Sequence, residues 1–274
     1  MTFPVYIPIG PWRIHPHLFF ESLSYFIGFR VYLALRRRAG DTVIVPDRWA
    51  TLSCAAAGAA LGARVLAWLA NPQATYDLTS VLLGGKTIVG GLIGGLVGVE
   101  LVKLAMGIRR STGDLYAPAL AVAIAIGRVG CLLTGIADDT SGTPTSLPWG
   151  MDLGDGIRRH PTQIYEIVVL AAMVVPLWRL ARRTMAVAAT TEAEGQRAAG
   201  GVLREGDAFK AFMVAYLGLR LVVDFVKPYP AVFLGLGVLQ WACVATIAWY
   251  ARDIWRWTGR RGAAVRLGQR LSEQ

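Results

Sequence analysis

The sequence predicts an all-α protein with about seven helices that cross a membrane. The first observation is composition: 54% of the 274 residues are hydrophobic and only 17% are charged, whereas about a quarter of the residues in a typical soluble domain are charged. The second is that several apolar stretches reach about 20 residues, the length that crosses a hydrocarbon layer roughly 30 Å thick. The chain is therefore expected to be a multi-pass membrane protein surrounded by membrane lipids.

The expected spans are separated by segments rich in proline, glycine and charge. They run near 18–35, 49–69, 87–108, 115–135, 161–180, 208–226 and 232–251. Together they form a single integral membrane domain over residues 1–274. Residues 184–207 are small, polar and rich in glycine, which is typical of a flexible cytoplasmic linker. Residues 136–160 form a long loop on the outer side.

Lys and Arg residues are far more frequent on one side of this topology than on the other. Cytoplasmic loops of membrane proteins carry such an excess, so we expect the N terminus outside and the C terminus in the cytoplasm. The basic residues lie between apolar segments rather than in one exposed patch. Anionic lipid head groups therefore account for the net charge of +10, and no nucleic-acid partner is expected.

Arg128 lies within the apolar run "LAVAIAIGRVGCLLTG" at residues 120–135. An ionisable residue inside a span indicates a function or a specific partner. Neighbouring glycines such as Gly130 let a helix or a ligand approach the backbone closely, and a planar guanidinium fits a phosphate or a carboxylate. We expect Arg128 to bind an anion, and the alternative is a structural ion pair with a distant acid such as Glu166.

Two further motifs place polar side chains in or beside spans. Arg220 and Asp224, in "LRLVVDFVKP" at 219–228, are four residues apart and can neutralise each other on one helical face. In "RRHPTQIYE" at 158–166, Pro161 suits the first turn of a helix, and His160 precedes it. His160 can act as a general acid or base near neutral pH, and the alternative is an interfacial residue with its imidazole in water.

The loop at 136–160 is acidic, and carboxylates are the ligands that Ca²⁺ and Mg²⁺ prefer. Its aspartates are Asp138, Asp139, Asp152 and Asp155. Their spacing matches no metal-binding loop, and aspartate is common in turns, so we expect no metal site and no cofactor. The three cysteines lie in apolar segments, which favours small buried side chains over disulfides.

Six motifs follow one another in an order found in a known family. They are "YFIGF" (25–29), "LGARVLAWL" (61–69), "TIVGGLIGG" (87–95), "GRVGCLLTG" (127–135), "RHPTQIYE" (159–166) and "LRLVVDFVKP" (219–228). The chain resembles the bacterial prolipoprotein diacylglyceryl transferases over nearly its whole length. The resemblance implies a seven-span inner-membrane enzyme that moves the diacylglyceryl group of phosphatidylglycerol to the lipobox cysteine of a lipoprotein signal peptide.

The resemblance also implies which residues form the site. Arg128 and Arg220 correspond to the family's essential arginines, which would hold the lipid phosphate and stabilise the leaving group. His160 is a candidate catalytic base. The further residues expected to contact substrate are Tyr25, Arg64, Gly90, Gly91, Gly94, Gly95, Gly130, Asp139 and Glu166.

The sequence also departs from the family pattern. Val89 stands where the family usually has a histidine, which is a candidate base for the acceptor thiol. Cys131, Thr134 and Ile136 replace the polar residues of the family's "GNF.N.E" motif. A base could come from His160 or Asp139 instead. The chain therefore resembles a divergent member or a paralogue, in which the lipid donor is more readily retained than the acceptor.

Two alternatives stay open at the level of sequence. The first is a paralogous transferase that uses phosphatidylglycerol with a different acceptor, such as a hydroxyl, which the missing histidine favours. The second is a non-catalytic lipid-binding membrane protein, since intramembrane arginines and glycine-rich helices would also suit a lipid path. A transporter would show internal repeats, and the sequence shows none.

Overall fold

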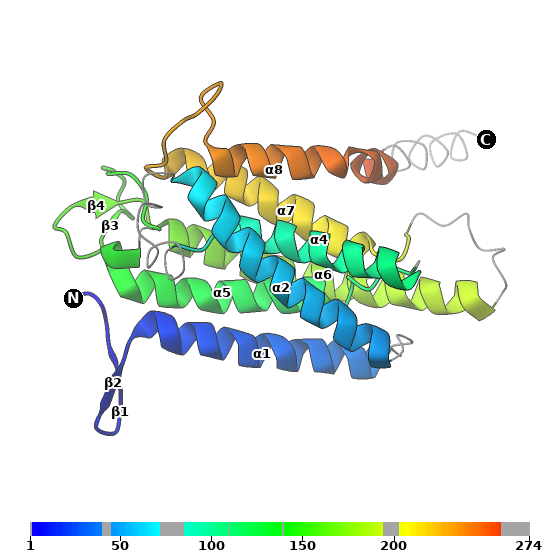
Figure 1. Cartoon of the computed structure of the whole chain (residues 1–274). Helices are drawn as coiled ribbons and strands as arrows, with labels where there is room; N and C mark the ends of the chain where they lie inside the picture. Colours follow the sequence, from blue (N-terminus) through cyan, green and yellow to red (C-terminus); the bar gives the residue numbers. More distant parts are fainter. Residues whose placement is uncertain are drawn as a thin grey trace, which may run out of the picture.

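In the computed structural model, the residues described are 2–39, 45–71, 85–108, 110–138, 140–193 and 203–258. One helix corresponds to each expected span (Figure 1). The helices are α1 (Pro16–Ala39), α2 (Val45–Ala70), α4 (Ile88–Met106), α5 (Tyr116–Thr134), α6 (Thr162–Ala193), α7 (Asp207–Val223) and α8 (Val238–Trp249). The first five of these are long and apolar enough to cross a membrane, whereas α7 has 17 residues and α8 has 12. The all-α membrane class is confirmed, and the side on which each terminus lies stays a prediction.

The little β-structure in the described residues gathers at one end of the helical bundle. Two short antiparallel hairpins pair β1 (Ile7–Ile9) with β2 (Trp12–Ile14), and β3 (Met151–Asp152) with β4 (Arg158–Arg159). Both hairpins lie beside the start of α1 and the end of α5 (Figure 1). Two 3-10 helices, η2 (Gly135–Asp138) and η3 (Asp224–Val226), extend α5 and α7 at this same end. We call it the strand end.

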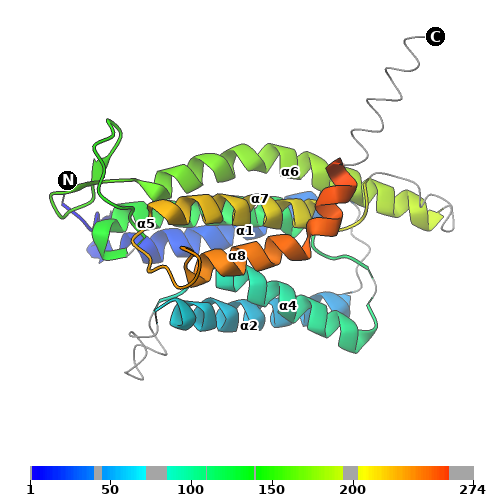
Figure 2. The same ribbon diagram turned by 90° about the horizontal axis from the view of Figure 1, so that it is seen from above.

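Helix α5 is the central packing element of the bundle. It packs against α1 and α6 and also contacts α7, while α2 and α4 lie together on the side away from α6 (Figure 2). Ala117 and Ala121 of α5 are fully buried, and their small side chains allow close approach. Phe212 and Tyr216 of α7 supply the largest buried rings of the core. This packing brings the ends of α5, α6 and α7 together at the strand end.

Helices α2 and α4 are in contact through glycine backbones. A Cβ on Gly94 would collide with the carbonyl of Gly58, and one on Gly90 would collide with the carbonyl of Gly62. Thr87 begins α4, because its Oγ1 accepts a hydrogen bond from the Gly90 backbone at 3.1 Å. Small residues at a helix–helix interface are the usual solution in membranes, where close backbone approach provides the attraction.

The segments expected to be irregular differ in what the structure adds. Helix α6 continues beyond the expected span and ends at Ala193, so the first part of the 184–207 segment is helical, and residues 194–202 lie outside the described residues. The loop at 136–160 contains η2, β3 and β4. Its backbone is tied to the start of α6, because His160 N–H donates to Thr143 O at 3.1 Å and Gly142 N–H donates to His160 O at 3.1 Å.

Candidate active site

A buried set of charged side chains surrounds Glu166 at the strand end. Glu166 Oε2 accepts from Nε of Arg128 at 2.8 Å, and Oε1 accepts from Nη1 of Arg220 at 2.7 Å and from Nζ of Lys227 at 3.1 Å. Asp224 lies 2.7 Å from Nη2 of Arg220 in a further ion pair. We call these five residues the glutamate cluster. All five are buried, so their charges interact with other protein groups rather than with water.

Three chain segments supply the glutamate cluster. Arg128 lies on α5 and Glu166 lies in the first turns of α6, just after Pro161. Arg220, Asp224 and Lys227 come from the end of α7 and the residues after it, at spacings of four and three, so they follow one helical face. The packing of α5 against α6 and α7 therefore determines which charges meet.

The charges of the glutamate cluster do not balance. Among the described residues it contains three cations, Arg128, Arg220 and Lys227, against two carboxylates, Glu166 and Asp224. Nε of Arg220 is buried and has no hydrogen-bond partner in the described part of the chain. Burying an uncompensated charge costs several kcal/mol, on the order of a broken buried pair. A surplus of buried cationic donors is the arrangement that an anionic ligand, such as a phosphate, would complete.

The geometry confirms one of the two sequence interpretations of Arg128, and the binding of an anion stays a prediction. Arg128 does form the ion pair with Glu166 that was the structural alternative. The same pair leaves a positive excess, so it holds the guanidinium in place without cancelling the charge of the site. Arg220 likewise pairs with Asp224, as the four-residue spacing predicted. Glu166 is fully buried, and its carboxylate contacts the two arginines rather than solvent.

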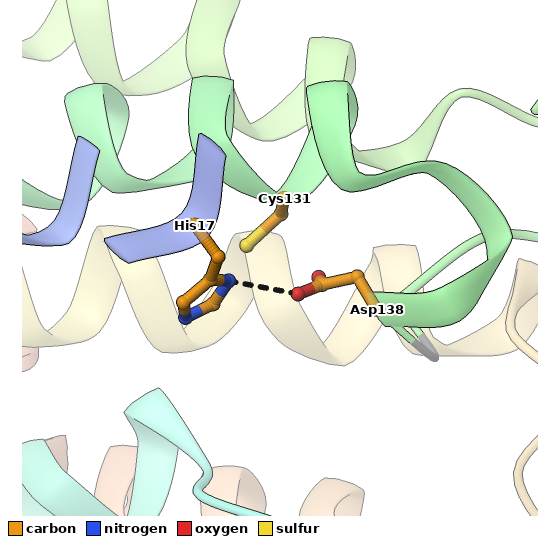
Figure 3. A group of neighbouring side chains, drawn as sticks. All are labelled: His17, Cys131 and Asp138. Atoms are coloured by element: carbon orange, nitrogen blue, oxygen red, sulfur yellow. Dashed lines mark ion pairs between the residues drawn. The ribbon is translucent and has the colours of Figure 1, made fainter. Parts of the chain in front are cut away.

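A second group of polar side chains lies next to the first, and Figure 3 shows its three members. His17, Cys131 and Asp138 come from the start of α1, the last turns of α5, and η2, and one potential ligand atom from each lies within 4.8 Å of the others. Nδ1 of His17 is 2.9 Å from Oδ1 of Asp138. We call these three residues the histidine cluster. Sγ of Cys131 also accepts from Nη1 of Arg128 at 3.8 Å, so the two clusters are in contact.

Charged and polar neighbours orient the histidine cluster on both sides. Glu21 Oε2 lies 3.8 Å from Nε2 of His17, and Glu21 Oε1 accepts from Nζ of Lys86 at 3.3 Å. Oδ2 of Asp138 accepts from the Thr140 hydroxyl at 2.7 Å. The side chain of His17 is 41% exposed, whereas that of Asp138 is 8% exposed. The cluster therefore opens on its histidine side and is closed on its aspartate side.

His160 belongs to a separate network in the loop. Its Nδ1 lies 3.2 Å from the Tyr165 hydroxyl, which accepts from Nε1 of Trp149 at 2.9 Å. In the same loop, a hydrogen bond from the Arg159 guanidinium lowers the pKa of the Asp155 carboxyl. These contacts give His160 a structural partner, and its proposed catalytic role stays a prediction.

The comparisons with known proteins agree with the motifs and the buried arginines. A sequence profile described as prolipoprotein diacylglyceryl transferase matches residues 4–255. The chain belongs to this family. A phosphatidylglycerol–prolipoprotein diacylglyceryl transferase from Bordetella parapertussis is 32% identical over 258 residues, covering 85% of each chain. One from Methylibium petroleiphilum is 29% identical over 280 residues, covering 94% of this chain and 97% of the relative.

The other described residues that the family resemblance suggested lie on different helices and not in one site. Tyr25 is 69% exposed on α1 and its hydroxyl donates to Glu21 at 3.3 Å. Arg64 lies partly buried on α2, a helix that packs mainly against α4. Gly130 lies against Phe20 and Pro16 of α1. Asp139 lies outside the described residues.

The four glycines of α4 divide into two pairs. Gly90 and Gly94 touch the backbone of α2, whereas Cβ atoms on Gly91 and Gly95 would meet α2 at ordinary contact distances, 3.7 and 3.4 Å at the nearest. The geometry therefore accounts for Gly90 and Gly94 as helix-packing residues. A lipid contact for any of the four stays a prediction.

Sequence reasoning missed Lys227, His17 and Cys131 as site residues. Lys227 lies one residue beyond the expected span 208–226, although its spacing of seven from Arg220 places it on the same face. Cys131 was interpreted as a small buried side chain, and its contact with a histidine of α1 depends on the packing of α1 against α5. The substitution of the family histidine by Val89 was visible, but its burial in the core, at 1% exposure, was not.

Proposed function

We propose that this protein transfers the diacylglyceryl group of phosphatidylglycerol to the cysteine thiol of a prolipoprotein, with the lipobox of a signal peptide as its acceptor. The observation that carries the proposal is the positive excess of the glutamate cluster, in a chain of this family. The relatives named above are phosphatidylglycerol–prolipoprotein diacylglyceryl transferases. The family and the apolar helices support a multi-pass position in the bacterial inner membrane as part of this proposal.

Negative charge develops on the leaving phosphate group during the reaction and must be stabilised there. The acceptor sulfur forms a bond to the glyceryl carbon, and the bond from that carbon to the phosphate oxygen breaks. The electron pair stays on the phosphate, so a diester monoanion becomes a monoester with more negative charge. Arg128 and Arg220 supply preorganised donors where this charge develops, and donors of this kind contribute about 3 to 4 kcal/mol each in the oxyanion holes of acyl-transfer enzymes.

Glu166 and Lys227 complete this arrangement as positioning groups. Glu166 fixes the arginines by accepting from both, which removes the entropy of two flexible side chains before the lipid arrives. Lys227 supplies the positive excess, because Glu166 and Asp224 together balance the two arginines. The donor lipid can enter sideways between helices because its acyl chains stay in the bilayer while its head group reaches the strand end.

The test is turnover of labelled phosphatidylglycerol with a synthetic lipobox peptide in detergent. Arg128→Ala should lower turnover by about 10²- to 10³-fold, because it removes a charged donor to the leaving group. Arg30→Ala is the matched control, since Arg30 is an exposed arginine of α1 outside both clusters. Full turnover in Arg128→Ala would contradict the assignment of the phosphate to this cluster.

A second candidate function has its own observation. Val89 is buried in the core at the α4 position where the family usually has a histidine, so this position offers no base to an acceptor thiol. A transferase with the same donor and a different nucleophile would consume the lipid while the peptide cysteine stays unmodified. In the same assay, a lipid-binding protein without chemistry would bind phosphatidylglycerol and leave it intact.

A further inference from the structure

We propose that His17, Cys131 and Asp138 form a zinc site whose open coordination position takes the acceptor thiolate. The three residues offer a ring nitrogen, a thiolate sulfur and a carboxylate oxygen within 4.8 Å of one another (Figure 3). Three protein ligands plus one open position is the pattern of catalytic zinc, and nitrogen and sulfur ligands favour Zn²⁺ over Ca²⁺ or Mg²⁺. The role in thiol activation rests on the proposed function, whereas the metal site itself does not.

The three ligand atoms lie near the separations of a tetrahedral site, and the histidine–aspartate pair is closer than a bound ion allows. Zn–N and Zn–O bonds of about 2.0 to 2.2 Å and a Zn–S bond of about 2.3 Å place ligand atoms roughly 3.3 to 3.8 Å apart. Nδ1 of His17 and Oδ1 of Asp138 are 2.9 Å apart, so a small outward shift of each admits the ion between them. The partial exposure of His17 leaves that side of the site accessible to an acceptor.

The neighbours of the histidine cluster have the form of a metal site's outer contacts. Metal-binding histidines commonly direct their second nitrogen to a carboxylate, and metal-binding carboxylates accept a further hydrogen bond. Here Nε2 of His17 faces Glu21 at 3.8 Å, and Oδ2 of Asp138 accepts from the Thr140 hydroxyl at 2.7 Å. With Nδ1 as the ligand, each side chain already has this second contact.

The charges also fit the proposed reaction. Zn²⁺ with the thiolate of Cys131 and the carboxylate of Asp138 is neutral, so an acceptor thiolate makes the site negative by one. Nη1 of Arg128 is 3.8 Å from Sγ of Cys131 and joins the site to the glutamate cluster, whose single positive excess then faces both the acceptor thiolate and the lipid phosphate. The acceptor and the lipid phosphate would therefore bind on two sides of the same arginine.

A zinc ion would promote deprotonation of the acceptor thiol, for which Val89 offers no base. A thiol bound to Zn²⁺ held by His17, Cys131 and Asp138 would give up its proton to water. Its sulfur would bond to the glyceryl carbon as the bond from that carbon to the phosphate oxygen breaks, with the electron pair staying on the phosphate. The thioether product would be a weaker zinc ligand than the thiolate and would be released. The step needs no oxidant or reductant.

Co²⁺ binding tests the site without any turnover. The full-length protein in detergent is stripped with a chelator, titrated with Co²⁺, and followed by absorbance. We expect one Co²⁺ per chain, with the d–d bands of a tetrahedral ion and a sulfur-to-cobalt charge-transfer band. Cys131→Ser should lose the charge-transfer band, and His17→Gln should weaken binding by at least tenfold. Cys243→Ser, at a buried cysteine of α8, is the matched control and should retain both signals.

Turnover then separates the metal from the proposed reaction. We expect the chelated protein to lose transfer to the lipobox peptide and to recover it with Zn²⁺. The zinc site would be overturned by a wild-type protein that binds no Co²⁺, or by one that keeps full transfer after its metal has been removed. His17 and Asp138 would then be a hydrogen-bonded histidine–aspartate pair without a metal. A protein that binds Co²⁺ through Cys131 but never modifies the peptide would keep the site and refute the proposed acceptor.

Discussion

Two buried carboxylates contact the two ends of helix α7, and they meet different partners. Asp114 lies at the start of α7 and accepts backbone N–H groups from Gly206 at 2.8 Å and Ala208 at 2.9 Å. Glu166 lies near the end of α7 and accepts from Arg128, Arg220 and Lys227. One carboxylate faces neutral donors and the other faces three cations.

The difference separates a charge whose partners come from the helix backbone from one whose neighbours keep a positive excess. The N–H groups at a helix N-terminus have no partner within the helix, so Asp114 satisfies donors that the fold itself leaves open. Glu166 and Asp224 together do not neutralise the cations around them, and a buried Nε of Arg220 has no partner among the described residues. Burial alone does not indicate a ligand, whereas a buried charge excess is the feature on which the proposed phosphate site rests.

The largest effect expected at these carboxylates is that of Glu166→Gln. Removing this charge leaves Arg128, Arg220 and Lys227 with Asp224 alone, and breaking a buried ion pair costs about 3 to 5 kcal/mol. The variant should unfold at a clearly lower temperature in detergent, measured by tryptophan fluorescence or by size-exclusion recovery after heating.

Lipid can sharpen this first comparison. If the cluster binds phosphate, phosphatidylglycerol should restore part of the lost stability of Glu166→Gln, and phosphatidylcholine should restore less because its head group carries a compensating cation. Equal effects of the two lipids would mean that the cluster is structural, like Asp114.

The helices were predictable because span length is a local property of the sequence. An apolar run of about 20 residues indicates a membrane helix whatever it packs against, and each expected span corresponds to one helix of the structure. The pair of Arg220 and Asp224 was predictable for the same reason, since both residues lie on one helical face. The contact of Arg128 with Glu166 was named only as an alternative, because it depends on how α5 packs against α6.

The histidine cluster was beyond the reach of local patterns. His17 begins α1, while Cys131 and Asp138 belong to the end of α5 and to η2, so their contact exists only after α1 has packed against α5. The charge excess around Glu166 was hidden for a similar reason: Lys227 follows the helix and looks like an ordinary loop cation. Sequence identified the arginines, and only the packing shows what surrounds them.

A middle-sized effect is expected for Lys227→Met. The substitution keeps most of the side-chain volume and removes one cation, so the charges of the glutamate cluster balance and its attraction for an anion falls. Hydrogen bonds to charged groups contribute about 1.5 to 3 kcal/mol, so phosphatidylglycerol should bind at least tenfold more weakly. Binding can be measured by fluorescence titration with a labelled lipid.

Lys86→Met is the matched control within the same end of the bundle, because Lys86 contacts Glu21 and not Glu166. Equal losses in both variants would argue for general electrostatic attraction.

The smallest effect is expected at Asp114. Asp114→Ala removes the acceptor for backbone donors at the start of α7, which costs about 1 to 2 kcal/mol at helix N-termini, while phosphatidylglycerol binding should stay unchanged. Asp114→Asn should lose less, because it keeps one acceptor oxygen.

Burial raises the pKa of the Asp114 carboxyl, although the backbone donors oppose this. The native state therefore holds the proton more tightly than the unfolded chain, so stability falls as pH rises through the titration of this group. Asn does not titrate, so unfolding curves of wild type and Asp114→Asn should move apart in favour of the variant as pH rises over that range. Curves that stay parallel over that range would show that the backbone donors fully offset burial.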